Sequence, residues 1–166
     1  MTPAEHLKSI AATRIMMLDG SHLFPMEQPV ATAAAIEAAL LNLASIIEKE
    51  SGLQAERGLV SSVFVNRLNT GMRLQTDPTV IYGVADYHGR ITRAHLRDPH
   101  PYNTYRHQGL PPGPIALTSQ ASLQAAAQPA VSDLYYFVSK GDGTHQFSST
   151  LQQHNAAVKK YIFGER

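Results

Sequence analysis

The chain has 166 residues, a length typical of one domain that buries a substantial core without disulfides or metal ions. It contains no cysteine, which excludes a disulfide framework and a thiolate metal site. A net charge of +1 and the lack of any basic run exclude strong electrostatic capture of nucleic acid. No segment is expected to form a membrane span, and no secretory apolar region follows Met1. We therefore expect a soluble chain without a signal or membrane anchor of its own.

Residues 1–30 are predicted to form an N-terminal helix and a linker. Thr2, Pro3 and Glu5 supply a capping box with proline at the first helical position. Residues 31–166 are predicted to hold the main fold, and the whole chain is expected to form one compact unit.

A central helix is predicted from Ala31 to about Glu50, where Ser51-Gly52 ends it. Apolar residues recur along it at spacings of three and four, which places one stripe on one helix face: Ile36, Leu40, Leu43 and Ile47. The next position of this stripe is Glu50. A carboxyl group at the end of a buried stripe must find partners or keep its proton.

Glu48 lies two residues before Glu50 and roughly 200° around the helix from it, since each residue turns about 100°. We therefore expect Glu48 to point more nearly to solvent and Glu50 to be the candidate catalytic acid. The alternative for Glu50 is a structural salt bridge at the helix end, with Arg57 or Arg67 as partner. The pattern alone leaves both interpretations open.

The middle of the chain is predicted to be helical and then irregular. A second amphipathic helix is expected over 55–69, and Asp77 is expected to cap a short helix that begins with Pro78. The β-branched run 79–81 offers a strand as the alternative. Residues 84–117 are proline-rich and irregular, with one helical turn near 92–96. Irregular segments of this length in compact domains are usually functional or disordered.

The last third is predicted to contain a helix over 119–127, a hairpin and a final helix. The hairpin strands are expected at 134–139 and 145–147, on either side of a glycine-rich turn, and Thr150 is expected to cap a helix that ends near Tyr161. Together these elements predict an α+β fold: a mostly helical single domain with a small antiparallel β-sheet.

Two polar clusters are candidate binding segments. Gln75, Thr76 and Asp77 lie beside a turn, and Asn103, Thr104 and Tyr105 combine donors, acceptors and a ring, as a sugar site requires. The eight histidines form no pair at metal-ligand spacing on one helix face, so we expect no metal site.

Several segments occur in one order that closely resembles the catalytic domain of MltG-type (YceG-like) endolytic murein transglycosylases. They are Leu43–Ser51, Phe64-Val-Asn-Arg-Leu68, Met72-Arg-Leu-Gln-Thr-Asp-Pro-Thr-Val-Ile-Tyr-Gly83, Tyr102-Asn-Thr-Tyr105, Gly109-Leu-Pro-Pro-Gly113 and Tyr136-Phe-Val138. The resemblance covers about Asn42 to the C-terminus and assigns 31–166 to the catalytic domain. The family's membrane anchor and LysM-like region are not matched.

The resemblance implies a lysozyme-like cleft and cleavage of the MurNAc–GlcNAc β-1,4 bond of peptidoglycan, leaving a 1,6-anhydro-MurNAc end without any cofactor. It assigns the catalytic role to Glu50 and substrate-binding roles to two groups: Gln75, Thr76 and Asp77, and Asn103, Thr104 and Tyr105. It also implies peptidoglycan strands and peptidoglycan synthases as partners, at the periplasmic face of the bacterial inner membrane.

Three alternatives are weighed against this interpretation. A lysozyme-like muramidase would use water, positioned by Asp77. A non-catalytic glycan-binding or synthase-docking module would use Glu50 structurally. A pyridoxal-phosphate lyase is disfavoured because none of the five lysines has a phosphate-cradling context: Lys8, Lys49, Lys140, Lys159 and Lys160.

Overall fold

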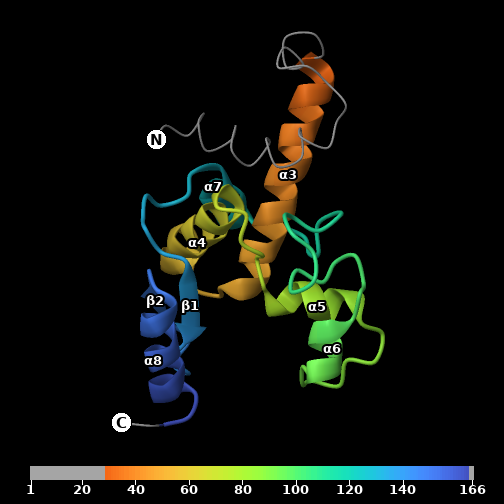
Figure 1. The fold of residues 1–166 in the computed structure, drawn as a ribbon. Helices are drawn as coiled ribbons and strands as arrows, with labels where there is room; N and C mark the ends of the chain where they lie inside the picture. The colour runs from red at the N-terminus through yellow and green to blue at the C-terminus, as the bar shows by residue number, and fades with distance from the viewer. Residues whose placement is uncertain (1–28, 165–166) are drawn as a thin grey trace.

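The structure, a computed structural model, describes residues 29–164 (Figure 1). In chain order the elements are α3 (Pro29–Glu50), a 3₁₀ turn (Gln54–Glu56), α4 (Arg57–Asn69), α5 (Asp77–Gly83), α6 (Arg93–Arg97), α7 (Gln120–Ala127), β1 (Tyr136–Ser139), β2 (His145–Ser148) and α8 (Leu151–Tyr161). The fold is a mostly helical α+β domain with a small antiparallel sheet, as the sequence predicts. The predicted helix and linker at 1–30 lie almost entirely outside the described residues.

The predicted central helix is confirmed as α3, which begins two residues earlier than expected and ends at Glu50. Its C-terminal half is buried, whereas its N-terminal half projects from the body of the domain (Figure 1). Two buried polar side chains of the C-terminal half hold the proline-rich segment against α3. Asn42 Nδ2 donates to the carbonyl of Pro111 at 2.5 Å, and Ser45 Oγ accepts from the amide of Ile115 at 3.0 Å.

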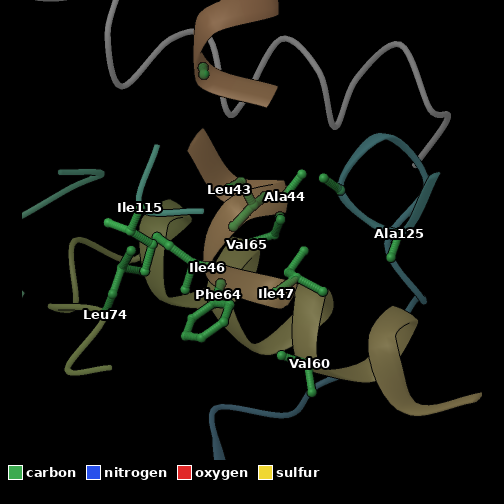
Figure 2. Close-up of a cluster of buried hydrophobic side chains, with 12 residues drawn as sticks. Leu43, Ala44, Ile46, Ile47, Val60, Phe64, Val65, Leu74, Ile115 and Ala125 are labelled. Atoms are coloured by element: carbon green, nitrogen blue, oxygen red, sulfur yellow. The ribbon is translucent and has the colours of Figure 1, made fainter. Parts of the chain in front are cut away.

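The core forms where α3 meets α4 and α7 (Figure 2). Leu43, Ile46 and Ile47 of α3 are fully buried and pack in one cluster with α4 residues that include Phe64. Burying a side chain of this size contributes about 1.5 to 3 kcal/mol, so this cluster fixes the end of α3 that carries Glu50.

The expectation that no segment forms a membrane span meets one helix in the described residues that is long and apolar enough for a span. Val30–Glu50 has a mean hydropathy of 1.8 over its most apolar window, enough for a span by that test. The core helix of a globular domain passes the same test, and the C-terminal half of α3 packs into the domain core.

The middle elements follow the sequence prediction with two differences. Residues 79–81 belong to α5, so the strand alternative is wrong. The cap predicted at Asp77 is wrong, because Asp77 is already the first residue of α5 and Thr76 holds the N-cap position. The Asp77 side chain accepts a hydrogen bond from Tyr105 instead. Thr92 caps α6 with a capping box, which confirms the helical turn expected near 92–96.

The predicted hairpin and last helix are confirmed. β1 and β2 pair antiparallel, with Phe137 opposite Phe147, and β1 begins two residues later than expected. Thr150 caps α8 with a capping box, and α8 packs against both strands. This unit and α5–α6 lie on either side of the C-terminal end of α3 in Figure 1, which places Glu50 between them.

Candidate active site

Glu50 lies at the wall of a pocket of about 330 Å³. The last turn of α3 brings Glu50 to this pocket, the segment before α5 brings Gln75, and the first residue of α5 is Asp77. The remaining lining residues come from α4, the segment before α5, the loop after α6, the hairpin and α8: Arg67, Leu74, Tyr105, Tyr136, Phe137, Leu151 and His154. The structure therefore brings together four of the residues singled out from the sequence: Glu50, Gln75, Asp77 and Tyr105.

Burial raises the pKa of Glu50 from its ordinary 4.5 to about 7, and the nearby negative charge of Asp77 acts in the same direction. A hydrogen bond from Thr76 and the electrostatic influence of His145 and Arg67 oppose this rise. No ion pair to Glu50 occurs among residues 29–164, so the helix-end salt bridge considered above is not formed there. Such a carboxyl group can hold or release a proton near neutral pH.

Thr76 is buried behind Glu50 and does not line the pocket. Its hydroxyl donates to Glu50 Oε1, while its amide donates to Thr104 Oγ1 at 3.1 Å. Thr104 Oγ1 in turn lies 2.8 Å from Thr79 Oγ1. The three buried threonines thus form a continuous polar layer that holds the backbone beside Glu50 in place.

Gln75 has a φ of 50°, the one left-handed conformation of a non-glycine residue between residues 29 and 164. Its amide donates to the carbonyl of Thr104 at 3.2 Å. Uncommon backbone conformations persist where the surroundings fix them, and they concentrate at functional sites. This conformation places an exposed Gln75 side chain at the pocket, directly before buried Thr76.

Asp77 and Tyr105 form a polar pair at the pocket. Tyr105 Oη donates to Asp77 Oδ1 at 2.6 Å. Burial and the hydrogen bond with Asp77 raise the pKa of Tyr105 above its ordinary value of 10.0, so the phenol keeps its proton at physiological pH. The ring therefore offers both a flat apolar face and a fixed hydroxyl to a ligand.

Arg67 is a buried cation at the same pocket. Its Nε donates to the carbonyl of Tyr135 at 2.7 Å and its Nη1 to that of Leu74 at 2.6 Å, and its guanidinium lies 5.3 Å from the ring centre of Tyr136. These bonds connect α4 with the segment before Gln75 and with the start of β1. Arg67 thus joins three walls of the pocket and brings positive charge near Glu50.

Asn103 and Thr104 are buried and do not line the pocket. Asn103 Nδ2 donates to the carbonyls of His95, Leu96 and Asp98, the last at 2.7 Å, and its Oδ1 accepts from the amide of Tyr105 at 2.9 Å. The structure therefore shows Asn103 binding its own loop, in a position to orient Tyr105.

Glu48 lies nearer to solvent than Glu50, as predicted, with a side chain that is 24% exposed, but it is held by several partners. Its carboxylate forms an ion pair with Arg57 at 3.2 Å and accepts from the amide and hydroxyl of Ser119, at 2.9 and 2.5 Å. The pKa of Glu48 is lowered to about 2, mainly by the hydrogen bonds from Ser119. The charge of Arg57 contributes less. Glu48 is therefore an ionised residue that joins α3, α4 and the start of α7.

The sequence offered Arg67 only as a possible salt-bridge partner of Glu50. It predicted no site role for the residues of the hairpin and α8 that line the pocket. The segments that resemble the family contain Arg67, Tyr136 and Phe137, so the resemblance could have identified these residues as candidates. His154 had none, and its place is set by stacking on the Tyr136 ring at 5.2 Å between centres. Burial lowers the pKa of His154.

A sequence profile described as the YceG-like family matches residues 5–160. The chain belongs to this family. It is 46% identical over 123 residues to the endolytic murein transglycosylase of Bacillus subtilis (strain 168), a match that covers 74% of the chain and 34% of that protein. It is 30% identical over 129 residues to the endolytic murein transglycosylase of Streptococcus pneumoniae (strain D39), over 74% of the chain and 23% of that protein.

The fold is also similar to the crystal structure of a yceG-like protein from Listeria monocytogenes, with a TM-score of 0.66 and 28% identity over 94% of this chain and 67% of that one. The chain spans about a third of the length of the Bacillus relative and about a quarter of that of the Streptococcus one. The similarity therefore concerns one part of these longer proteins.

Proposed function

We propose that the chain is the catalytic domain of an endolytic murein transglycosylase. Its substrate would be the glycan strand of peptidoglycan, cut at the MurNAc–GlcNAc bond to leave a 1,6-anhydro-MurNAc end. The observation that carries the proposal is a carboxyl group with a pKa of about 7 at the wall of a polar and aromatic pocket, in a chain whose relatives bear this name.

Glu50 acts twice in this mechanism. In its protonated form it donates its proton to the glycosidic oxygen while the bond from that oxygen to C1 breaks. In its ionised form it then takes the proton of the MurNAc C6 hydroxyl while O6 bonds to C1. A pKa near the working pH suits a group that must be first an acid and then a base.

The intramolecular nucleophile explains why a second catalytic carboxylate is unnecessary. Ordinary glycosidases use two carboxyl groups, one as the acid and one to supply or activate a nucleophile. Here the substrate's own hydroxyl lies close to C1, so little entropy is lost on attack and no water is consumed. The N-acetyl oxygen of MurNAc would steady the positive charge that develops at C1.

The residues around Glu50 divide by position. Gln75, Asp77 and Tyr105 line the pocket and are proposed to contact the sugar, together with the ring faces of Tyr136 and Phe137. Thr76, Thr104 and Asn103 are buried and are proposed to position Glu50, Gln75 and Tyr105. Arg67 is proposed to hold the pocket walls together.

A second candidate is hydrolysis, because the pocket holds a second carboxylate. Asp77 lies close enough to Glu50 to raise its pKa, and it could direct a water molecule at C1. The product would then carry a reducing end instead of an anhydro end.

Mass spectrometry of sacculi digested by the chain separates the two reactions. A transglycosylase leaves anhydro ends one water lighter than hydrolytic ends, and in heavy-oxygen water its products gain no label. Reducing ends that carry heavy oxygen would show that the chain is a muramidase instead. A cell-envelope location at the periplasmic face of the inner membrane and contact with peptidoglycan synthases follow as proposals from the family.

A further inference from the structure

A second pocket, of about 500 Å³, also reaches Glu50. Its other lining residues come from the segment after α3 and from the turn of the hairpin: Gly52, Leu53, Ser139, Asp142, Gly143, Thr144 and His145. Among the described residues the two pockets share Glu50 alone. Glu50 therefore lies at the boundary between two spaces, each in the size range typical of ligand pockets.

The turn that forms one wall of this hairpin pocket is fixed by its own bonds. Asp142 Oδ1 accepts from the amide of Thr144 at 2.9 Å and from its hydroxyl at 2.6 Å. Gly141 and Gly143 have φ values of 84° and 87°, a conformation that glycine adopts without strain. The wall is thus ordered before any ligand binds.

His145 contributes a side chain to this wall that can form a hydrogen bond. Glu56 accepts from the amide of His145 at 3.1 Å and pairs with its Nδ1 at 2.7 Å. A carboxylate can only accept, so Nδ1 carries the hydrogen and Nε2 is the remaining polar atom. The ring packs edge-on against Phe137, 5.5 Å between centres, and the described part of the chain gives Nε2 no hydrogen-bond partner.

We infer that the hairpin pocket binds the amino-sugar ring on the far side of the scissile bond, with His145 Nε2 bonded to a sugar hydroxyl and Leu53 against the ring face. The inference rests on the proposed function. An enzyme that cuts inside a strand must hold sugar on both sides of the bond it breaks. Because Glu50 separates the two pockets, a strand whose scissile bond lies at Glu50 places one sugar in each.

Two substitutions test the pocket in different ways, with peptide-free glycan strands as the soluble substrate and anhydro ends as the measured product. His145→Ala removes the hydrogen bond, and His88→Ala is the control because His88 is exposed and lies in neither pocket. Gly52→Ala and Gly52→Leu fill the pocket stepwise, since a Cβ at Gly52 meets nothing within 4 Å and needs no backbone strain.

We expect His145→Ala to raise KM about fivefold, the usual effect of one lost hydrogen bond, and His88→Ala to leave KM unchanged. Gly52→Leu should raise KM more than Gly52→Ala, with kcat and melting temperature close to wild type in both. If His145→Ala unfolds, the two Gly52 variants still test the second subsite, because both keep the bond between His145 and Glu56.

Unchanged KM in both Gly52 variants, with anhydro ends still formed, would overturn the second subsite and leave the proposed transglycosylase reaction standing. Absence of anhydro ends from the wild-type chain would overturn the proposed function, and the inference with it.

Discussion

Replacing Thr76 with valine removes one hydrogen bond from Glu50 and changes the shape of the side chain very little. Thr76 is 2% exposed, and its hydroxyl donates to Glu50 Oε1. This bond favours the ionised carboxylate and holds the pKa of Glu50 below the value that burial alone would set. We therefore expect Thr76→Val to raise that pKa.

The size of the change follows from the two protonation states. A hydrogen bond to a charged group contributes about 1.5 to 3 kcal/mol, and one to a neutral group about 0.5 to 1.5 kcal/mol. The difference of about 1 to 1.5 kcal/mol corresponds to about one pKa unit. The pKa of Glu50 should move from about 7 in the wild type to about 8 in the variant.

The pH dependence of kcat/KM on peptide-free glycan strands measures this change, because it reports the pKa values of the free enzyme. The proposed reaction begins with protonated Glu50, so activity should fall above about pH 7 in the wild type and above about pH 8 in Thr76→Val. Thr76→Ser keeps the donor and should restore the wild-type profile. An alkaline limb at the same pH in all three proteins would refute the role given to Thr76.

Three further predictions concern stability. Glu48→Gln should lower the free energy of unfolding by about 1 to 3 kcal/mol, because it weakens the bonds to Arg57 and Ser119; a chemical denaturation midpoint equal to wild type would contradict this. Asn103→Ala should lower melting temperature and turnover together, because the side chain binds its own loop; a loss of turnover alone would indicate substrate contact. Glu50→Gln should have a higher melting temperature than wild type above pH 7 and the same one at about pH 4. The raised pKa of Glu50 makes the wild-type protein lose stability as pH rises from 4.5 to about 7, and glutamine does not ionise. Thermal melts at both pH values measure the difference.

Most helices and strands were predictable because their signals are local, and the Thr150 cap was too, whereas the cap predicted at Asp77 was wrong. The spacing of apolar residues located α3 and α4, and Thr92, Ser119 and Thr150 each cap a helix where the sequence placed one. The same spacing led to Glu50, since the stripe that ends at Glu50 is the face that packs into the core.

Contacts between distant residues explain what the sequence could not supply. The partners of Glu48 were not expected because the main one, Ser119, is 71 residues away along the chain. Asn103 has a side chain suited to sugars, yet its neighbours in the loop use all of its donors and its acceptor. The left-handed Gln75 and the bond from Thr76 to Glu50 depend on how the loop packs, which no local pattern records.

The most direct test of the central claim is the rate at which anhydro-muropeptides form from purified sacculi in wild type, Glu50→Gln and Glu48→Gln. If Glu50 is the acid and base, Glu50→Gln should lose on the order of 10² to 10⁴-fold in rate while remaining folded. Glu48→Gln should keep its turnover at temperatures below its lowered melting point. Full activity in Glu50→Gln, or a folded Glu48→Gln without activity, would contradict the account.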